Sequence, residues 1–213
     1  MDSTAWDKRY ADRELVWGAP PNRYVVEYAS ALAPGRALDL ACGEGRNAIW
    51  LATRGWRVTG SDFSAVALGK AAQVAAGAPR SVGARLTWRR ADAVTDELGG
   101  PYDLVLHVYL HLAAAARTAV LARACAALAP GGTLLVVAHD GTNLTDGTGG
   151  PQDPDVLYTP ADVVAALPVD MTVQVAQTPR REVPGADRAA IDCLVLARRG
   201  GETMPRQPPK TRS

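Results

Sequence analysis

From residue 36 onward, the chain alternates between short apolar runs and longer stretches in which apolar residues recur at helical spacing. The short runs are rich in Val, Ile and Leu and end at glycine, proline or acidic residues, a pattern typical of buried strands. The longer stretches are long enough for amphipathic helices. The pattern predicts strands at residues 36–41, 56–62, 85–92, 102–111 and 133–140, and helices at 45–55, 64–77 and 113–132.

Strands that alternate with helices in this way form βαβ units, in which consecutive strands lie parallel and helices cover the sheet. After the fifth strand, a polar, glycine-rich loop at 141–155 leads to a short helix at 159–167. Two further strands, at 171–183 and 189–199, are joined by a brief turn and predict an antiparallel hairpin. The fold class is therefore α/β, with a Rossmann-like, doubly wound sheet of seven strands that is mainly parallel.

Two helices are predicted before the first strand. The first covers residues 3–15, and Asn22 can cap the second, just as Ser64 and Thr159 can cap the later helices at 64–77 and 159–167. The length of the chain fits one domain with a full core, which we assign to residues 1–199. Residues 200–213 are polar and proline-rich, and are expected to form a disordered tail.

The balance of charges excludes several partners. The net charge is +1, with 23 basic and 22 acidic residues, so nothing draws the chain to nucleic acid or to an anionic membrane. The apolar runs are too short to span a bilayer, and the N-terminal residues lack the pattern of a signal peptide. Cys42, Cys125 and Cys193 have no metal-binding or redox spacing, which predicts reduced thiols, no metal and a cytoplasmic location.

The turn after the first strand is the main candidate for a ligand site. It reads LDLACGEGRN at residues 38–47, and from Gly43 it matches the G-x-G-x-x-G/A dinucleotide fingerprint. However, Asp39 would place a negative charge near a bound diphosphate, at a cost of about 1–4 kcal/mol. The turn therefore favours a ligand with a positive charge, such as a cationic nucleoside.

A nicotinamide-dependent oxidoreductase is the alternative that the fingerprint supports. Asp62, at the end of the second strand, suits the ribose hydroxyls of either kind of nucleotide and does not discriminate. Asp39 opposes the dinucleotide, and no Y-x-x-x-K pair exists in the sequence. In addition, the fifth strand leads into a hairpin instead of a second mononucleotide-binding half.

At these residues the chain resembles a class I S-adenosylmethionine-dependent methyltransferase over roughly residues 1–199. LDLACGEGRNAIWLA resembles the first motif of that family, with Ala41 in place of its first glycine. VTGSDFS, RRADA, YDLVLHVYLHL and LAPGGTLLVV resemble the motifs that follow, in order. The family resemblance implies that only the last strand is antiparallel. WDKRY, PPN and the segment at 143–160 are most similar to the tellurite-resistance and thiopurine-type subgroup, whose acceptors are small molecules.

The resemblance also implies the residues that bind the cofactor. Asp39 would orient the methionyl ammonium, Asp62 would accept from the ribose hydroxyls, and Asp92 would accept from the adenine amino group. Residues 1–34 would form a helical cap over the cofactor. The remaining implied positions are Tyr10, Ala41, Gly43, Gly45, Phe63, Ala93 and His107. Their neighbours Cys42, Arg46, Asn47 and Ser64 are further candidates for cofactor binding.

Catalysis and acceptor binding are assigned to aromatic and polar residues near the expected methyl position. A phenol or amine acceptor would need a base, for which the candidates are His107, His111 and His139. A soft anion, such as a thiolate or a tellurite-derived species, would need none. The residues expected to contact the acceptor are Trp6, Trp17, Asn22 and Tyr109.

Each of these side chains also has a purely structural interpretation. The carboxylates and histidines can cap helices, and the aromatic residues can belong to the core. The arginines around the hairpin, Arg180, Arg181 and Arg188, can form a solvated edge, with a site for an anionic acceptor as the alternative. A sensor that binds the cofactor without turnover is a further alternative. The long loop and the N-terminal helix, which are suited to closing over an acceptor, argue against it.

Overall fold

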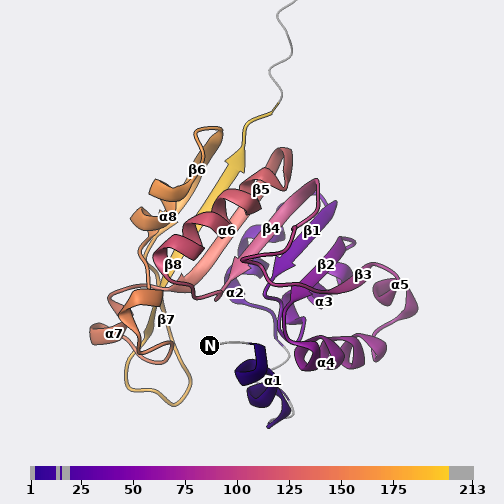
Figure 1. Cartoon of the computed structure of the whole chain (residues 1–213), viewed down its shortest axis with the longest axis horizontal. Helices are drawn as coiled ribbons and strands as arrows, with labels where there is room; N and C mark the ends of the chain where they lie inside the picture. The colour runs from indigo at the N-terminus through magenta and orange to yellow at the C-terminus, as the bar shows by residue number, and fades with distance from the viewer. Residues whose placement is uncertain (1–2, 13–14, 16–19, 202–213) are drawn as a thin grey trace, which may run out of the picture.

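The structure of this protein, a computed structural model, describes residues 3–12, 15 and 20–201. Seven strands form a continuous row in the order β3-β2-β1-β4-β5-β8-β6, and a short strand, β7, pairs with β8 outside this row. The arrangement is visible in Figure 1. The strands are β1 (Arg36–Leu40), β2 (Arg57–Asp62), β3 (Leu86–Arg90), β4 (Tyr102–Val108), β5 (Leu128–His139), β6 (Met171–Gln177), β7 (Arg180–Arg181) and β8 (Ala190–Arg199).

The sheet confirms the predicted fold class. Neighbouring strands from β1 to β5 pair in parallel, whereas β8 pairs antiparallel with both β5 and β6. The chain first proceeds outward from β1 to β3 and then returns to place β4 on the other side of β1. In a doubly wound sheet, ligands bind beyond the carboxyl ends of the strands at such a reversal.

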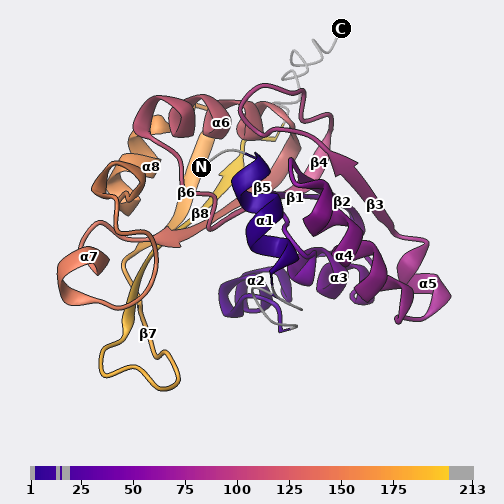
Figure 2. The same ribbon diagram turned by 60° about the horizontal axis from the view of Figure 1, so that its bottom comes forward.

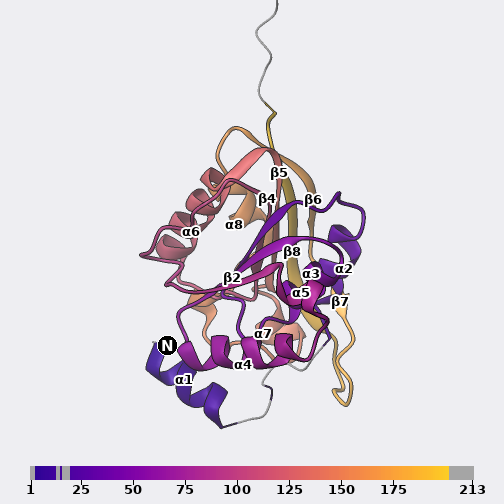
Figure 3. The ribbon, with the colours of Figure 1, turned by 90° about the vertical axis from the view of Figure 1, so that its right-hand side faces the viewer.

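Helices cover both faces of the sheet. α2 and α3 lie on one face and α6 and α8 on the other, as Figure 3 shows from the side. α1 lies against α4 (Figure 2). Within the described ranges, no helix is long and apolar enough to cross a membrane. The helices are α1 (Ser3–Ala11), α2 (Arg23–Ala29), α3 (Arg46–Thr53), α4 (Ala65–Ala76), α5 (Arg80–Gly83), α6 (Ala114–Ala126), α7 (Asn143–Asp146), the 3-10 helix η1 (Pro154–Val156) and α8 (Pro160–Ala166).

The predicted helix caps are present. The side chain of Asn22 accepts from the amide of Tyr24 at the start of α2, and that of Ser64 accepts from the third amide of α4. Thr159 and Asp162 form a reciprocal capping box at the start of α8. These three sites are local in sequence, which is why the residue pattern alone predicts them.

Alternation along β4 divides the core between the two faces. Leu104 and Leu106 pack with α2 and α3, whereas Val105 packs with α6 and α8. His107, two residues after Val105, continues on the second face, where its ring meets that of Tyr158. Because both faces are covered, β4 is buried along almost its whole length.

The helix predicted at 113–132 is shorter in the structure. α6 ends at Ala126, and β5 already begins at Leu128, two residues before Pro130. Leu128 pairs with Tyr102 across a register shift at the start of β4. Pairing with β4 therefore draws the segment around Pro130 into the sheet, a long-range effect that helical spacing does not predict.

The hairpin also differs from its prediction. The strand expected at 171–183 is divided into β6 and β7, and the amide of Asp192 donates to the carbonyl of Pro179 at the break. The fourth strand ends at Val108 because Tyr109 has a φ of 55°, which turns the chain out of the sheet. This turn directs Tyr109 toward the carboxyl ends of the strands.

Candidate active site

The turn after β1 is shaped by three residues in the left-handed region, Ala41, Gly43 and Gly45, with φ angles of 52°, 55° and 77°. Gly45 is the N-cap of α3, and a Cβ atom built there would lie 2.5 Å from the ring of Trp88. Only glycine fits this position, for both conformational and steric reasons. Ala41 adopts the same region at a cost of about 1–2 kcal/mol.

Asp39 lies beside this turn and is only 1% exposed. The amide of Ala48, in the first turn of α3, donates to its Oδ2 atom over 3.1 Å. Burial raises the pKa of Asp39 to about 7, although the Ala48 amide and the charge of Arg46 both oppose the rise. A cation bound next to Asp39 would favour its ionised form. The side chain therefore both caps α3 and suits a positively charged ligand.

Asp62 links the end of β2 to the same turn. Its Oδ2 accepts from the amide of Gly43 at 2.8 Å, and its Oδ1 accepts from the amide of Ser64 at 2.9 Å. Burial raises the pKa of Asp62, and the two amide hydrogen bonds oppose the rise. Glu44 instead forms an ion pair of 3.8 Å with Lys70 on α4. The carboxylates that flank the turn are thus Asp39 and Asp62.

Three predicted cofactor residues contribute to the packing around the turn. The Oδ1 atom of Asn47 accepts from the amide of Asn22 at 2.9 Å and so joins the starts of α3 and α2. Cys42 is buried, and its thiol contacts the Gly43 carbonyl at 3.7 Å. Burial lowers the pKa of Arg46, while the nearby Tyr109 and Asp39 side chains oppose this effect. Arg46 therefore lies within electrostatic range of both groups.

The residues predicted near the adenine lie after β2 and β3. The amide of Val94 donates to Oδ1 of the half-buried Asp92 at 2.8 Å, which closes a local turn. The carbonyls of Phe63 and Ala93 accept from Arg90 and Arg123. Asp92 therefore has the structural role considered above, and its remaining lone pairs leave it able to accept from a ligand.

α1 lies against the start of α4 (Figure 2). The carboxylate of Asp7 accepts from the hydroxyl of Ser64 and, at 3.3 Å, from the amide of Val66. Lys70 donates to the carbonyl of Tyr10, a buried residue whose ring lies 5.6 Å from that of Trp6. The helix thus covers the end of β2 near Asp62. Trp17 lies outside the described residues.

A second group of polar and aromatic side chains lies at the ends of β4, β5 and β8. The rings of His111 and His139 are stacked, with centroids 5.6 Å apart and planes 14° from parallel. Tyr109 lies 5.0 Å from His139, and Tyr158 lies 6.2 Å from His111. Two of the candidate catalytic histidines and the predicted acceptor residue Tyr109 are therefore adjacent.

His107 meets this group through the ring of Tyr158, with centroids 6.4 Å apart. It is fully buried, and neither ring nitrogen has a hydrogen-bond partner. Burial lowers its pKa to about 4, so the ring is neutral near pH 7. His111 differs because its Nδ1 lies 3.3 Å from the carbonyl oxygen of Val156. Burial lowers its pKa to about 4 as well, with a smaller contribution from His139.

Asp192 organises the second group, and the sequence analysis did not identify it. Its carboxylate is fully buried on β8, accepts from the hydroxyl of Tyr109 at 3.1 Å, and binds Nε of Arg181 at 2.7 Å. Arg181 is therefore paired, and the prediction of a solvated edge is wrong for this residue. The only signal in the sequence was one acidic residue inside the apolar run AAIDCLVL.

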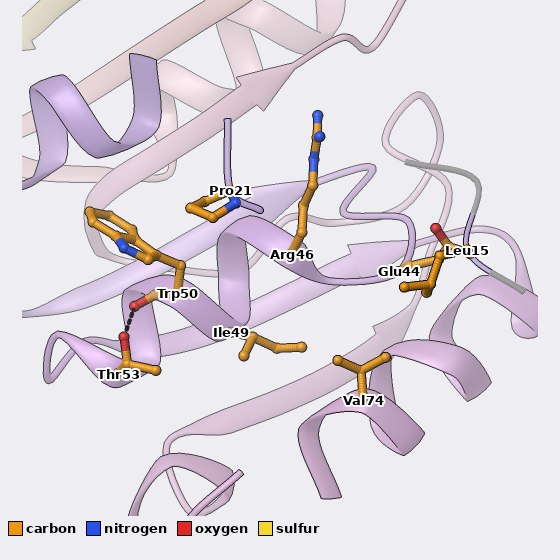
Figure 4. Close-up of a pocket in the computed structure, with 8 residues that line it drawn as sticks. All are labelled: Leu15, Pro21, Glu44, Arg46, Ile49, Trp50, Thr53 and Val74. Carbon is orange, nitrogen blue, oxygen red and sulfur yellow. Dashed lines mark hydrogen bonds between the residues drawn. The ribbon is translucent and has the colours of Figure 1, made fainter. Parts of the chain in front are cut away.

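A cavity of about 230 Å³ lies over the outer side of α3. Figure 4 shows Ile49 and Val74 near its centre and the side chain of Arg46 extending away from them. This volume is below the roughly 300–1,000 Å³ typical of cofactor sites, and the lining is mainly apolar. The carboxylates beside the glycine turn, rather than this cavity, define the candidate site.

Comparison with known proteins agrees with this geometry. Residues 37–132 match the sequence model of a family described as a methyltransferase domain. No curated protein sequence matches the chain. The solved structure of the glycopeptide N-methyltransferase MtfA with S-adenosylmethionine has a TM-score of 0.66 and 22% identity, covering 87% of this chain and 89% of the other.

Two further structures have a TM-score of 0.70. One comes from work on the conversion of a disulfide bond into a thioacetal group during echinomycin biosynthesis, at 19% identity, with 94% of this chain and 93% of that chain covered. The other is TehB from Haemophilus influenzae, at 18% identity, with 92% of this chain and 66% of that chain covered. At these identities the similarity establishes the fold.

The fold is that of S-adenosylmethionine-dependent methyltransferases, and residues 37–132 match their domain. MtfA was also crystallised with S-adenosylhomocysteine and with sinefungin. The domain and the fold support a methyltransferase enzyme with S-adenosylmethionine as cofactor. The side chains present fit this cofactor, because Asp39 suits an ammonium and Asp62 suits hydroxyls, whereas an ionised Asp39 would repel a diphosphate. Nothing in the comparisons favours a nicotinamide enzyme.

Proposed function

We propose that this protein transfers the methyl group of S-adenosylmethionine to a small-molecule acceptor. The observation that carries the proposal is the buried carboxylate of Asp39, whose pKa of about 7 leaves it ready to ionise beside a cationic ligand. The sulfonium of the cofactor supplies an activated methyl group. The protein's contribution is to align the acceptor and exclude water, which can supply several kcal/mol.

The proposed cofactor contacts follow the two strand ends. Asp39 holds the methionyl ammonium, and Asp62 accepts from the ribose hydroxyls. Asp92, the Ala93 amide and Phe63 form the adenine end. The turn itself contributes backbone at Ala41, Cys42, Gly43 and Gly45. Arg46 and Asn47 at the start of α3 and Ser64, the N-cap of α4, complete the set.

We propose that residues 1–199 act as one domain, with residues 1–34 covering the cofactor. The hydrogen bonds from Ser64 and Val66 to Asp7 support this role for α1, because they fix the helix next to Asp62. Tyr10 and Trp6 would then lie over the adenosine. We also propose a cytoplasmic location, which the free thiols of all three cysteines support.

For the acceptor, we propose a small molecule and no nucleic acid. The near-neutral charge of the chain supports this choice. His111, His139 and Tyr109 are the proposed contacts because their rings lie together beyond β4 and β5. Trp6 and Asn22, together with Trp17 outside the described residues, complete the proposed set. The tellurite-resistance and thiopurine-type subgroup remains part of this proposal, and MtfA suggests that peptide-derived amines also belong in any acceptor panel.

Calorimetry would test the cofactor assignment. We expect S-adenosylmethionine and S-adenosylhomocysteine to bind and NAD and NADP not to bind. Binding of a nicotinamide nucleotide alone would contradict the proposal. Transfer of a radiolabelled methyl group to thiols, phenols, amines and chalcogen oxyanions would then separate an enzyme from a sensor, which would bind the cofactor and methylate none of them.

A further inference from the structure

Asp192 is a carboxylate in an unusual place. It is 0% exposed and lies within β8, between β5 and β6 of the sheet. Ionised carboxylates are rarely buried unless they are paired and hydrogen-bonded. Arg181 provides two contacts, from Nε at 2.7 Å and from Nη2 at 3.4 Å, and the Tyr109 hydroxyl adds a third. Burial alone would lower the pKa of Arg181, but its hydrogen bonds to Asp192 raise it, so the guanidinium stays charged beside the carboxylate.

His139 is the direct cross-strand neighbour of Asp192 in the β5–β8 ladder. Side chains at such positions lie on the same side of the sheet and contact one another. The Nδ1 atom of His139 is 3.6 Å from Oδ1 of Asp192, and no hydrogen-bond partner satisfies this buried nitrogen. A small rotation of the ring would bring Nδ1–H into hydrogen-bonding range of the carboxylate.

The orientation of the ring determines which nitrogen can act as a base. When Nδ1 carries the proton and faces Asp192, Nε2 presents its lone pair on the opposite edge of the ring. His139 keeps 12% of its side chain exposed. Gly150, with a φ of 76°, passes close to the ring, since a Cβ atom there would lie 2.6 Å from Cδ2, 2.7 Å from Cγ and 2.9 Å from Nε2. A glycine at this position therefore avoids a clash with the Cδ2 side of the ring, next to Nε2.

The surroundings favour a neutral imidazole. The groups that face His139 are Asp192 and Arg181, which neutralise each other, together with Tyr109 and the stacked ring of His111. Burial lowers the pKa of His139, and the charge of Asp192 opposes this effect. Near pH 7 the ring is thus a proton acceptor, and the imidazolium formed by proton uptake would be stabilised by the carboxylate behind it.

We propose that His139 accepts the proton of the methyl acceptor at Nε2, that Asp192 is the positioning residue for His139, and that the acceptor is a protonated oxygen or nitrogen nucleophile such as a phenol or an amine. The inference rests on the proposed methyltransferase function. The nucleophile attacks the methyl carbon, and the carbon–sulfur bond breaks with its electron pair remaining on sulfur. The proton of the nucleophile passes to Nε2 and then to solvent. An anion that is already ionised has no proton to give and would not need this pair.

Nitrogen NMR of the histidine rings would test the geometry without any acceptor. The sample is protein labelled with ¹⁵N-histidine and saturated with S-adenosylhomocysteine, and the signals of His139 are assigned as those that His139→Asn removes. We expect His139 to be the Nδ1–H tautomer at pH 7.5. Asp192→Asn should shift it toward the Nε2–H tautomer. An Nε2–H tautomer in the wild-type protein would overturn the inference. Unchanged binding of S-adenosylhomocysteine would show that the proposed cofactor function stands even then.

Kinetics would test the acceptor class. With a phenol or amine that the wild type methylates, we expect Asp192→Asn to lower kcat at pH 7.5 by about 10²-fold. The KM for S-adenosylmethionine should change little, and the loss of kcat should be smaller at high pH. Asp170→Asn is the matched control, because Asp170 also pairs with an arginine, Arg199 at 3.1 Å, but on the surface. The assignment would be overturned if selenite or tellurite were the only acceptors that the wild type methylates. It would also be overturned if Asp192→Asn lowered kcat equally with a thiolate acceptor.

Discussion

The amide of Gly43 donates to Oδ2 of Asp62 over 2.8 Å and so fixes the glycine turn to the end of β2. The same carboxylate also accepts from Ser64, at the start of α4. One side chain therefore holds together the turn proposed for the methionine and ribose and the helix that α1 covers. The position of Asp62 is at once structural and suited to a ligand.

Asp62→Asn should weaken cofactor binding at least about tenfold, because an amide nitrogen would replace one of two accepting oxygens and face a backbone donor. We expect a loss of about 1–3 kcal/mol in the free energy of unfolding for the same reason. Calorimetry with S-adenosylhomocysteine and urea denaturation measure the two effects. Asp103→Asn is the control, since Asp103 accepts from the amide of Arg36 at the opposite end of the sheet. Equal affinity in the two variants would contradict the ribose assignment.

Cofactor binding should depend on pH through Asp39. Because its pKa in the free protein is about 7, the fraction of the carboxylate that is ionised rises about tenfold between pH 6 and pH 8. The ammonium requires this ionised form. We therefore expect the Kd of S-adenosylhomocysteine to fall by up to about tenfold over this range, and Asp39→Asn to abolish the dependence. A flat profile in the wild type would exclude Asp39 as the ammonium partner.

The same carboxylate should reduce the stability of the free protein at alkaline pH. Burial raises the pKa of Asp39 in the fold above its unfolded value, so its contribution is fully present below about pH 4 and is lost as the pH rises through about 7. Asp39→Asn keeps an acceptor for the Ala48 amide and removes the charge. At pH 8 we expect this variant to be more stable by on the order of 2 kcal/mol, while binding the cofactor more weakly than the wild type. Urea denaturation at pH 5 and pH 8 measures the difference, and a destabilised variant at pH 8 would contradict it.

A structural feature can be predicted from the sequence when the residues that determine it are close together along the chain. The strand–helix alternation and the caps at Asn22, Ser64 and Thr159 arise from neighbouring residues, and the structure confirms them. The acids at the ends of β1 and β2 were found because a parallel sheet gathers such positions at one edge. By contrast, the pairing of Asp192 with Arg181 depends on β7, which exists only because the chain folds back along β8.

The same reasoning explains the errors. The helical spacing of apolar residues predicts one helix over residues 113–132. In the structure, Leu128 pairs instead with Tyr102 of β4, a contact between segments that are distant in the sequence. His107 looked equivalent to His111 and His139 in the sequence, but strand alternation directs it into the face covered by α6 and α8. The direction of a side chain at the end of a strand depends on the residue at which the strand stops. Here β4 stops before Tyr109 because that residue has a positive φ.

Replacement of Gly45 should separate backbone strain from steric exclusion. Gly45 and Gly149 both have left-handed φ angles, of 77° and 68°, but a Cβ atom at Gly149 meets nothing within 4 Å. Gly149→Ala should therefore cost about 1–2 kcal/mol. Gly45→Ala should cost about 1–3 kcal/mol more, since its methyl group would overlap the ring of Trp88. Urea denaturation measures both, and equal losses would show that Trp88 adjusts freely.

Asp7 should act on the cofactor site through α1 rather than on the fold. Its carboxylate accepts from Ser64 and Val66 at the start of α4, next to Asp62, and this is where α1 is held. Asp7→Ala removes both bonds, so we expect S-adenosylhomocysteine to dissociate about 3–10-fold faster, consistent with a loss of about 1 kcal/mol. Stopped-flow displacement measures this rate. Asp12→Ala, an exposed change just beyond the same helix, is the control. If Asp7→Ala and the control dissociate at the wild-type rate, α1 does not cover the cofactor.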